Sequence, residues 1–166
     1  MCFSSDTELL DVFNDPIRVD KLKKGDMLRY GHVIQCVVKY QVEGAWVCRF
    51  NQSLGITPFH PIKHKEGLPC IFPRSIQECT YESHILTLYT FIMESGHYVV
   101  TPNGIHALTL GHGYTDGVSY HPYFGTCLII NDISRMDGFQ KGTVIIPKGT
   151  IFTRDNERMI DGMITN

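Results

Sequence analysis

The fold class is decided by residues 34–50, which read IQCVVKYQVEGAWVCRF. The even positions from Ile34 to Val42 are apolar, with one further apolar residue at Val37, and polar residues lie between them. This period of two predicts a β-strand with one buried face. A Glu-Gly pair typical of a turn follows, and the alternation then resumes, so we expect the two halves to form a long hairpin.

Most of the remaining chain also favours strands. The turn residues Gly, Pro and Asn interrupt it at short intervals, and helical periodicity is nearly absent. Residues 7–13 follow a candidate helix cap, Asp6, but Pro16 ends the segment quickly, so we interpret it as a strand. Residues 132–137 are expected to form one helical turn. We therefore predict an all-β fold. The other expected strands are residues 84–93, 98–100, 105–110 and 143–146.

Length and composition exclude several classes of protein. The chain has 166 residues, of which 43% are hydrophobic, so it can bury a core of its own. The formal net charge is -2 without a basic cluster, which argues against a nucleic-acid partner. No apolar run approaches the ~18 residues of a membrane helix, and no signal-peptide pattern is visible. We expect an intracellular, cytoplasmic protein without a membrane partner.

The six cysteines are too sparse for a disulfide scaffold, although their even number leaves individual disulfides open. We expect most of them to be buried free thiols, with Cys36 in the core. His60 and His64 are four residues apart, but Pro61 argues against a helical metal-binding pair. Cys70 and Cys79 are too far apart for a compact zinc pair. We predict no metal and no cofactor.

Three motifs carry the candidate chemistry. Cys2 stands at the start of the chain, Thr57-Pro58-Phe59-His60 follows about fifty residues later, and a third segment joins His97 to the turn at Asn103. In this order they resemble the Hint superfamily, which includes inteins, bacterial intein-like domains and hedgehog autoprocessing domains. Residues 109–113 and 121–126 are similar to the Vint subgroup, the Hint domains associated with von Willebrand A-type proteins.

The resemblance implies a fold and an activity. The fold would be a compact horseshoe of β-hairpins, with residues 1–112 as the autoprocessing core and residues 113–166 as a C-terminal extension packed on the same domain. The activity would be a single autoproteolytic turnover in cis. In this reaction the thiol of Cys2 attacks the preceding carbonyl and converts a peptide bond into a thioester, an N–S acyl shift.

The same resemblance suggests roles for individual residues. Cys2 would be the nucleophile, and Thr57 would orient the scissile peptide through its hydroxyl. His60 would donate a proton to the departing nitrogen, because imidazole exchanges protons near neutral pH. His97 is either a second acid/base group or a structural residue, and Asn103 is either an oxyanion donor or a turn residue. We interpret His112 and His121 as structural.

Two departures from the superfamily narrow the expected reaction. Inteins end in His-Asn, which drives C-terminal cleavage, whereas Leu108 and Thr109 occupy those positions here. Hedgehog domains activate a sterol with a carboxylate near the second strand, and residues 36–39 contain none. We therefore expect N-terminal cleavage alone, with an upstream segment of the same polypeptide as substrate and water or another small nucleophile as acceptor.

Two other classes of function remain open at this level. The chain would also fit a catalytically silent β-domain of the same fold that binds a partner protein. A metal-stabilised β-module is the third alternative. Met1 stands where an upstream segment would be attached, and we expect the natural precursor to carry one.

Overall fold

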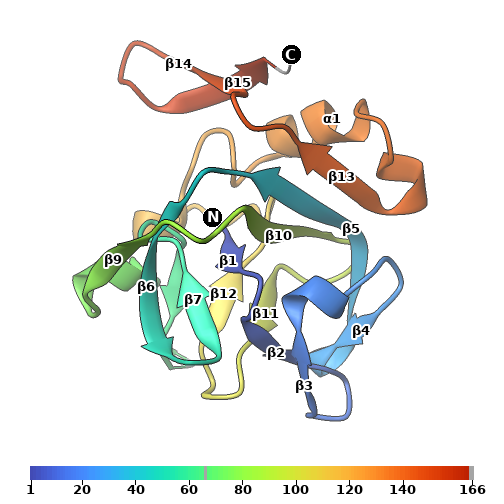
Figure 1. The fold of residues 1–166 in the computed structure, drawn as a ribbon, viewed down its shortest axis with the longest axis vertical. Coiled ribbons are helices and arrows are strands. Elements are labelled where there is room, and N and C mark those ends of the chain that lie inside the picture. The colour runs from blue at the N-terminus through green and yellow to red at the C-terminus, as the bar shows by residue number, and fades with distance from the viewer. Residues whose placement is uncertain (66, 165–166) are drawn as a thin grey trace.

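A computed structural model describes residues 1–65 and 67–164 of the chain and shows the predicted all-β fold (Figure 1). The main sheet has eight strands in the order β13-β5-β10-β1-β7-β6-β9, with β4 paired to β5. Strand β1 lies near the centre of this sheet, so the start of the chain is enclosed by later segments. The strands of the sheet are β1 (Phe3–Ser4), β4 (Met27–Leu28), β5 (His32–Gln41), β6 (Ala45–Asn51), β7 (Leu54–Ile56), β9 (Cys79–Glu82), β10 (Thr87–Met93) and β13 (Thr143–Ile146).

Three smaller sheets and one α-helix complete the described part of the chain. Strands β11, β12 and β8 form a three-stranded sheet, and two hairpins are formed by β2 with β3 and by β14 with β15. Their bounds are β2 (Glu8–Leu10), β3 (Pro16–Arg18), β8 (Ile62–Lys63), β11 (Tyr98–Val100), β12 (His106–Leu108), β14 (Ile151–Arg154) and β15 (Ile160–Ile164), and the helix is α1 (Cys127–Ser134). Single 3₁₀ turns occur at Val19–Lys21, Arg29–Gly31, Pro73–Ser75, Gly117–Ser119 and Phe139–Lys141.

The expected hairpin of residues 34–50 is wrong, because β5 and β6 do not pair with each other. Strand β5 pairs with β10, and β6 pairs with β7 and β9. The backbone amides of Val42 and Gly44 donate to Leu86 and Ile85. The Glu-Gly pair is thus a bend that keeps residues 32–51 alongside residues 79–93, rather than a reversal of the chain.

Strand β5 is buried on both faces at its centre, whereas the sequence predicted one buried face. Val37 and Ile34 belong to the main core cluster, while Cys36 and Val38 belong to a second cluster formed with the C-terminal part of the chain. Val37, the apparent exception to the alternation, is 1% exposed. The second layer is supplied by residues distant in sequence, so the strand's own pattern did not reveal it.

The C-terminal part of the chain provides that second layer. Strand β13 pairs in parallel with β5, and Ile129 and Ile133 of α1 are buried in the second cluster. Figure 1 shows α1, β13 and the β14–β15 hairpin together on one side of the sheet. The boundary at residue 112 stays a prediction. No helix in residues 1–65 and 67–164 is long and apolar enough to cross a membrane.

Several local predictions are confirmed and one is corrected. Residues 8–10 form a strand rather than a helix, and strands occupy the expected positions within 84–93, 98–100, 105–110 and 143–146. The helix expected at 132–137 starts earlier, at Cys127, because the hydroxyl of Thr126 caps it by accepting a hydrogen bond from the Leu128 amide. It ends at Ser134.

The cysteines follow the expectation only in part. Cys36 and Cys70 are buried free thiols. Cys48 and Cys79 form a disulfide between the facing strands β6 and β9, where their Cα atoms are 4.1 Å apart. Sequence spacing could not predict this pair, because it depends on the register of two strands that are distant in the chain.

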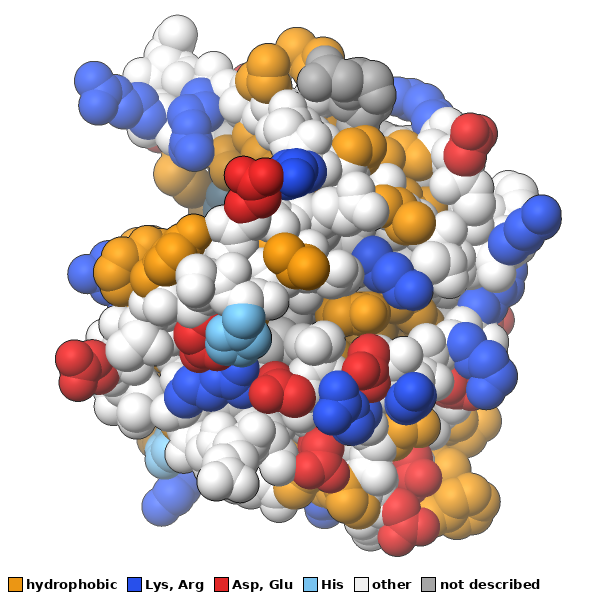
Figure 2. Space-filling model, viewed as in Figure 1, with side chains coloured by type: hydrophobic (Ala, Val, Ile, Leu, Met, Phe, Trp, Pro, Cys, Tyr) orange, Lys and Arg blue, Asp and Glu red, His pale blue; other side chains and the backbone are white. Residues whose placement is uncertain are grey.

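The face shown in Figure 2 carries acidic and basic side chains next to each other rather than a patch of one sign. This mixture agrees with the formal net charge of -2.

Candidate functional site

Cys2 is placed by the two strands that flank β1. Phe3 is opposite Ile56 of β7 on one side and Tyr89 of β10 on the other. Cys2, the residue before Phe3, pairs with Thr57: the Cys2 amide donates to the Thr57 hydroxyl oxygen at 2.9 Å, and the Thr57 amide donates to the Cys2 carbonyl at 2.9 Å. Thr57 therefore fixes the amide nitrogen that would leave in an acyl shift.

His60 lies next to the Cys2–Thr57 pair. The turn Thr57–His60 is closed by a hydrogen bond from the His60 amide to the Thr57 carbonyl, 3.2 Å long, and the two prolines restrict its backbone. The imidazole is completely buried and packs on the ring of Phe3, with ring centroids 4.8 Å apart. The sulfur-bearing residue and the imidazole predicted to act on it are thus brought together.

The tautomer of His60 follows from its contacts. Its Nε2 lies 2.6 Å from the carbonyl oxygen of Leu108, so in the neutral ring Nε2 carries the proton and donates it. Nδ1 is then an acceptor, and it is buried without a partner among the residues that the structure describes. A buried polar atom left unsatisfied costs free energy. Nε2 of His112 is buried without a partner in the same way.

The surroundings shift the pKa of both His60 and Cys2. Burial, followed by the nearby positive charge of the amino terminus, lowers the pKa of His60 to about 3, while the backbone of Leu108 and of Cys2 opposes this shift. Burial also raises the pKa of the Cys2 thiol, against the effect of the same terminal charge. At neutral pH the pair is therefore a thiol and an uncharged imidazole.

His97 and Asn103 occupy different ends of the β11–β12 hairpin. His97 lies at the end near Leu108, where its carbonyl accepts from the Thr109 amide, but its side chain is exposed and contacts the ring of Tyr114. Asn103 lies in the turn at the other end, exposed, where its side-chain oxygen accepts from the Thr101 hydroxyl. Asn103 thus lies in a turn, and its role stays a prediction.

Two contributors to the site were missed at the sequence level. Thr90 of β10 is 5% exposed, its hydroxyl has no partner within the described residues, and it lines the same cavity as Cys2. The carbonyl of Leu108 sets the tautomer of His60. Thr90 could have been found from the sequence, because it places a hydroxyl among the apolar residues of a buried strand. The carbonyl of Leu108 could not, because every residue has a backbone carbonyl.

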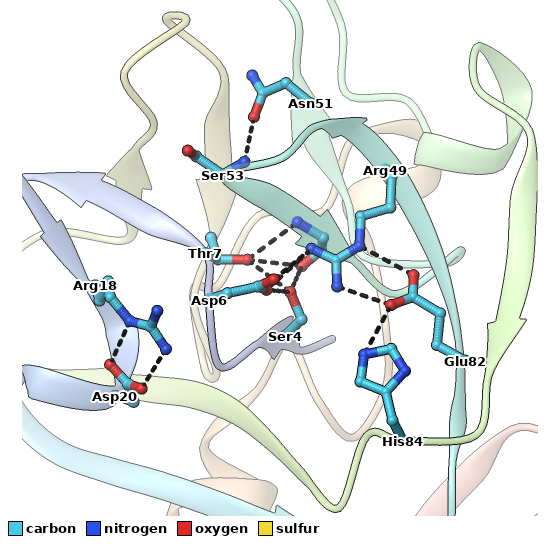
Figure 3. Close-up of polar contacts among 11 residues, drawn as sticks. Ser4, Asp6, Thr7, Arg18, Asp20, Arg49, Asn51, Ser53, Glu82 and His84 are labelled. Carbon is cyan, nitrogen blue, oxygen red and sulfur yellow. Dashed lines mark hydrogen bonds and ion pairs between the residues drawn. The ribbon is translucent and has the colours of Figure 1, made fainter.

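A polar cluster anchors the segment that follows Cys2 (Figure 3). The Thr7 hydroxyl donates to the Gly55 carbonyl at 2.9 Å, and the Gly55 amide donates back to the same hydroxyl at 3.1 Å. Arg49 binds Asp6 at 2.9 Å and holds both oxygens of Glu82 at 2.8 and 3.0 Å. A Cβ at position 55 would lie 2.4 Å from the Ser4 hydroxyl and 2.9 Å from the Arg49 guanidinium, so a larger residue here would displace these groups.

His112 and His121 hold loops of the C-terminal part. Nδ1 of His112 accepts from the Tyr114 amide at 2.9 Å, and Nδ1 of His121 accepts from the amides of Tyr123 and Phe124. The structural role of the two histidines stays a prediction. Among the described residues no three His, Cys, Asp or Glu side chains gather as metal ligands do, so the metal-stabilised alternative gains no support.

Comparisons with known proteins identify the class and then the family. A solved solution structure, that of a bacterial intein-like domain from Clostridium thermocellum, matches with a TM-score of 0.52 and 12% identity. The match covers 65% of this chain and 98% of that one, so the chain has the Hint fold. The Vint family of Hint domains matches residues 1–162, and the chain belongs to that family. None of the curated proteins matches the chain.

Proposed function

We propose that this Vint domain cleaves its own polypeptide once, at the bond before Cys2, through a thioester on the Cys2 sulfur. Domains of the Hint class are generally autoprocessing. The observation that carries the proposal is the arrangement at Cys2: its amide is held by the Thr57 hydroxyl, and the buried ring of His60 is close enough to the Cys2 backbone to interact with it.

The step balances without a cofactor. His60 takes the thiol proton of Cys2, the sulfur attacks the carbonyl of residue 1, and a carbon–sulfur bond forms. The carbon–nitrogen bond then breaks as His60 returns the proton to the nitrogen, which becomes the free amine of Cys2. Water or another small nucleophile next attacks the thioester and releases the upstream segment.

Two further features support this assignment. The Thr90 hydroxyl has a free proton to offer to the oxyanion that develops on the attacked carbonyl. In a precursor, a peptide group would replace the terminal ammonium that lowers the pKa of His60, which leaves burial as the main cause of the shift. The imidazole would then accept and release its proton more easily.

Cleavage at the C-terminal side is not part of the proposal. Leu108 and Thr109 stand where inteins carry His-Asn. Their backbone amides donate to Pro61 and His97, and the chain continues into the layer built by α1 and β13. Water or a small thiol or amine remains the proposed acceptor.

A fusion of an upstream protein to this chain tests the proposal. Incubation at pH 7–8 is expected to release the upstream protein, and an added thiol is expected to speed its release. Intact-mass measurements should place the cut before Cys2, and the Cys2→Ala fusion should stay whole, whereas Cys127→Ala, an exposed free cysteine, should cleave normally. A wild-type fusion that stays unchanged with thiol present would favour the silent binding module instead.

A further inference from the structure

An apolar cavity of about 180 Å³ lies beside Cys2, where the main sheet meets the C-terminal part of the chain. The sheet contributes Val38 and Leu88, and the C-terminal part contributes Phe124, Ile129 and Phe152. None of the described side chains that line it is charged. In Figure 2 the outline of the molecule is indented at the upper left, between the C-terminal hairpin and the body.

Met1, the residue on the acyl side of the proposed scissile bond, contributes to this cavity. Its side chain is partly buried and packs on the second core cluster, which includes Ile129. Hydrogen bonds to Thr57 fix the Cys2 backbone, and with it the amide that joins residue 1 to Cys2. Four of the residues that line the cavity, Phe124, Ile129, Ile146 and Phe152, come after position 112.

We propose that this cavity is a binding site for the side chain at position 1 of the substrate and that it selects large apolar residues there. The proposal rests on the proposed function and adds a substrate class to it. Filling the cavity removes apolar surface from water and positions the carbonyl for attack by the Cys2 sulfur. A charged side chain would lose its hydration without gaining a partner.

The first test is a series of precursors that differ only at position 1. Met1→Leu should cleave within about twofold of wild type, Met1→Ala roughly fivefold to tenfold more slowly, and Met1→Asp more than about tenfold more slowly. Equal first-order rate constants for all four, with cleavage still dependent on Cys2, would overturn the inference and leave the proposed function intact.

The second test changes the wall of the cavity. Phe152→Ala should reduce the rate ratio between the wild-type and Met1→Ala precursors by at least about half. The matched control is Ile151→Ala on the same strand, since Ile151 is 58% exposed. An unchanged ratio in Phe152→Ala, or an equal loss in Ile151→Ala, would contradict the subsite.

A third measurement does not depend on cleavage. In the uncleavable Cys2→Ala precursor with ¹³C-labelled methionine methyl groups, the Met1 methyl should show nuclear Overhauser contacts to the rings of Phe124 or Phe152. Met27, which is 46% exposed, is the internal reference for a solvated methyl. A Met1 methyl as solvated as that of Met27 would overturn the inference, whether or not the wild-type precursor cleaves.

Discussion

The two ends of the segment Cys2–Thr7 are held by opposite chemistry. At one end, Asp6 is bound by Arg49, which is itself paired with Glu82, and the Thr7 hydroxyl both donates to and accepts from Gly55. At the other end, Cys2 sits among uncharged side chains, and polar atoms of His60 and Thr90 are buried without partners within the described residues. The difference suggests that the anchored end supplies stability, while the end at Cys2 keeps hydrogen-bonding capacity for the reacting peptide.

The largest effect is expected from His60→Ala. Removing the group that carries the proton from sulfur to nitrogen should slow release of an upstream segment by roughly 10²–10⁴-fold. The rate constant is measured by intact-mass analysis of the fusion over time. His64→Ala is the control, because His64 is an exposed imidazole four residues away. Equal rates in wild type and His60→Ala would remove His60 from the reaction.

Substitutions at the anchored end, where Arg49 binds Asp6, are expected to change the stability of the protein. Arg49→Met leaves Asp6 and Glu82 without their cation and should lower the free energy of unfolding by about 2–3 kcal/mol. Arg18→Met breaks an exposed pair with Asp20 and should leave the free energy of unfolding nearly unchanged. Urea unfolding measures both variants, and similar losses for the two would contradict the anchoring role of Arg49.

The buried histidines predict how stability depends on pH. Burial lowers the pKa of His60 to about 3 and that of His112 to about 4, below the value near 6.5 expected in the unfolded chain. Their contribution to stability is present above pH 6.5 and is lost as the pH falls. Between about pH 6 and 4.5 each should lower the free energy of unfolding by up to about 1.4 kcal/mol per pH unit. A flat stability profile over this window would contradict neutral, buried rings.

The smallest effect is expected from Thr90→Val, which tests the difference between the two ends of the segment Cys2–Thr7. Thr90→Val keeps the shape of the side chain and removes its unpartnered hydroxyl, so cleavage should slow by about tenfold while stability stays equal or rises by up to about 1 kcal/mol. Thr80→Val, at an exposed position of β9, is the control. A loss of stability in Thr90→Val without a loss of rate would assign Thr90 to the anchored end instead.

Sequence reasoning was most successful where the information is local. The period of two, the Pro-Asn-Gly turn and the order of the motifs identified the all-β fold, the Hint class and the strands around the site. The proximity of Cys2, Thr57 and His60 followed from the resemblance, and the geometry agrees with it.

The incorrect or missing predictions concern the pairing of strands that are distant in the sequence. The bend at Glu43-Gly44 was interpreted as a hairpin, because a turn signal does not say which strand its amides will meet. The second buried face of β5, the Cys48–Cys79 disulfide and the position of Thr90 all depend on register between distant strands. Such pairings are decided by the packing of the whole sheet rather than by any single segment.

The most direct test of the thioester is chemical trapping. A wild-type fusion treated with hydroxylamine should release an upstream segment that ends at residue 1 as a hydroxamate, identified by its mass, and the Cys2→Ala fusion should release none. Release of the same segment from Cys2→Ala, or a wild-type cut at a different bond, would contradict acyl transfer to the Cys2 sulfur.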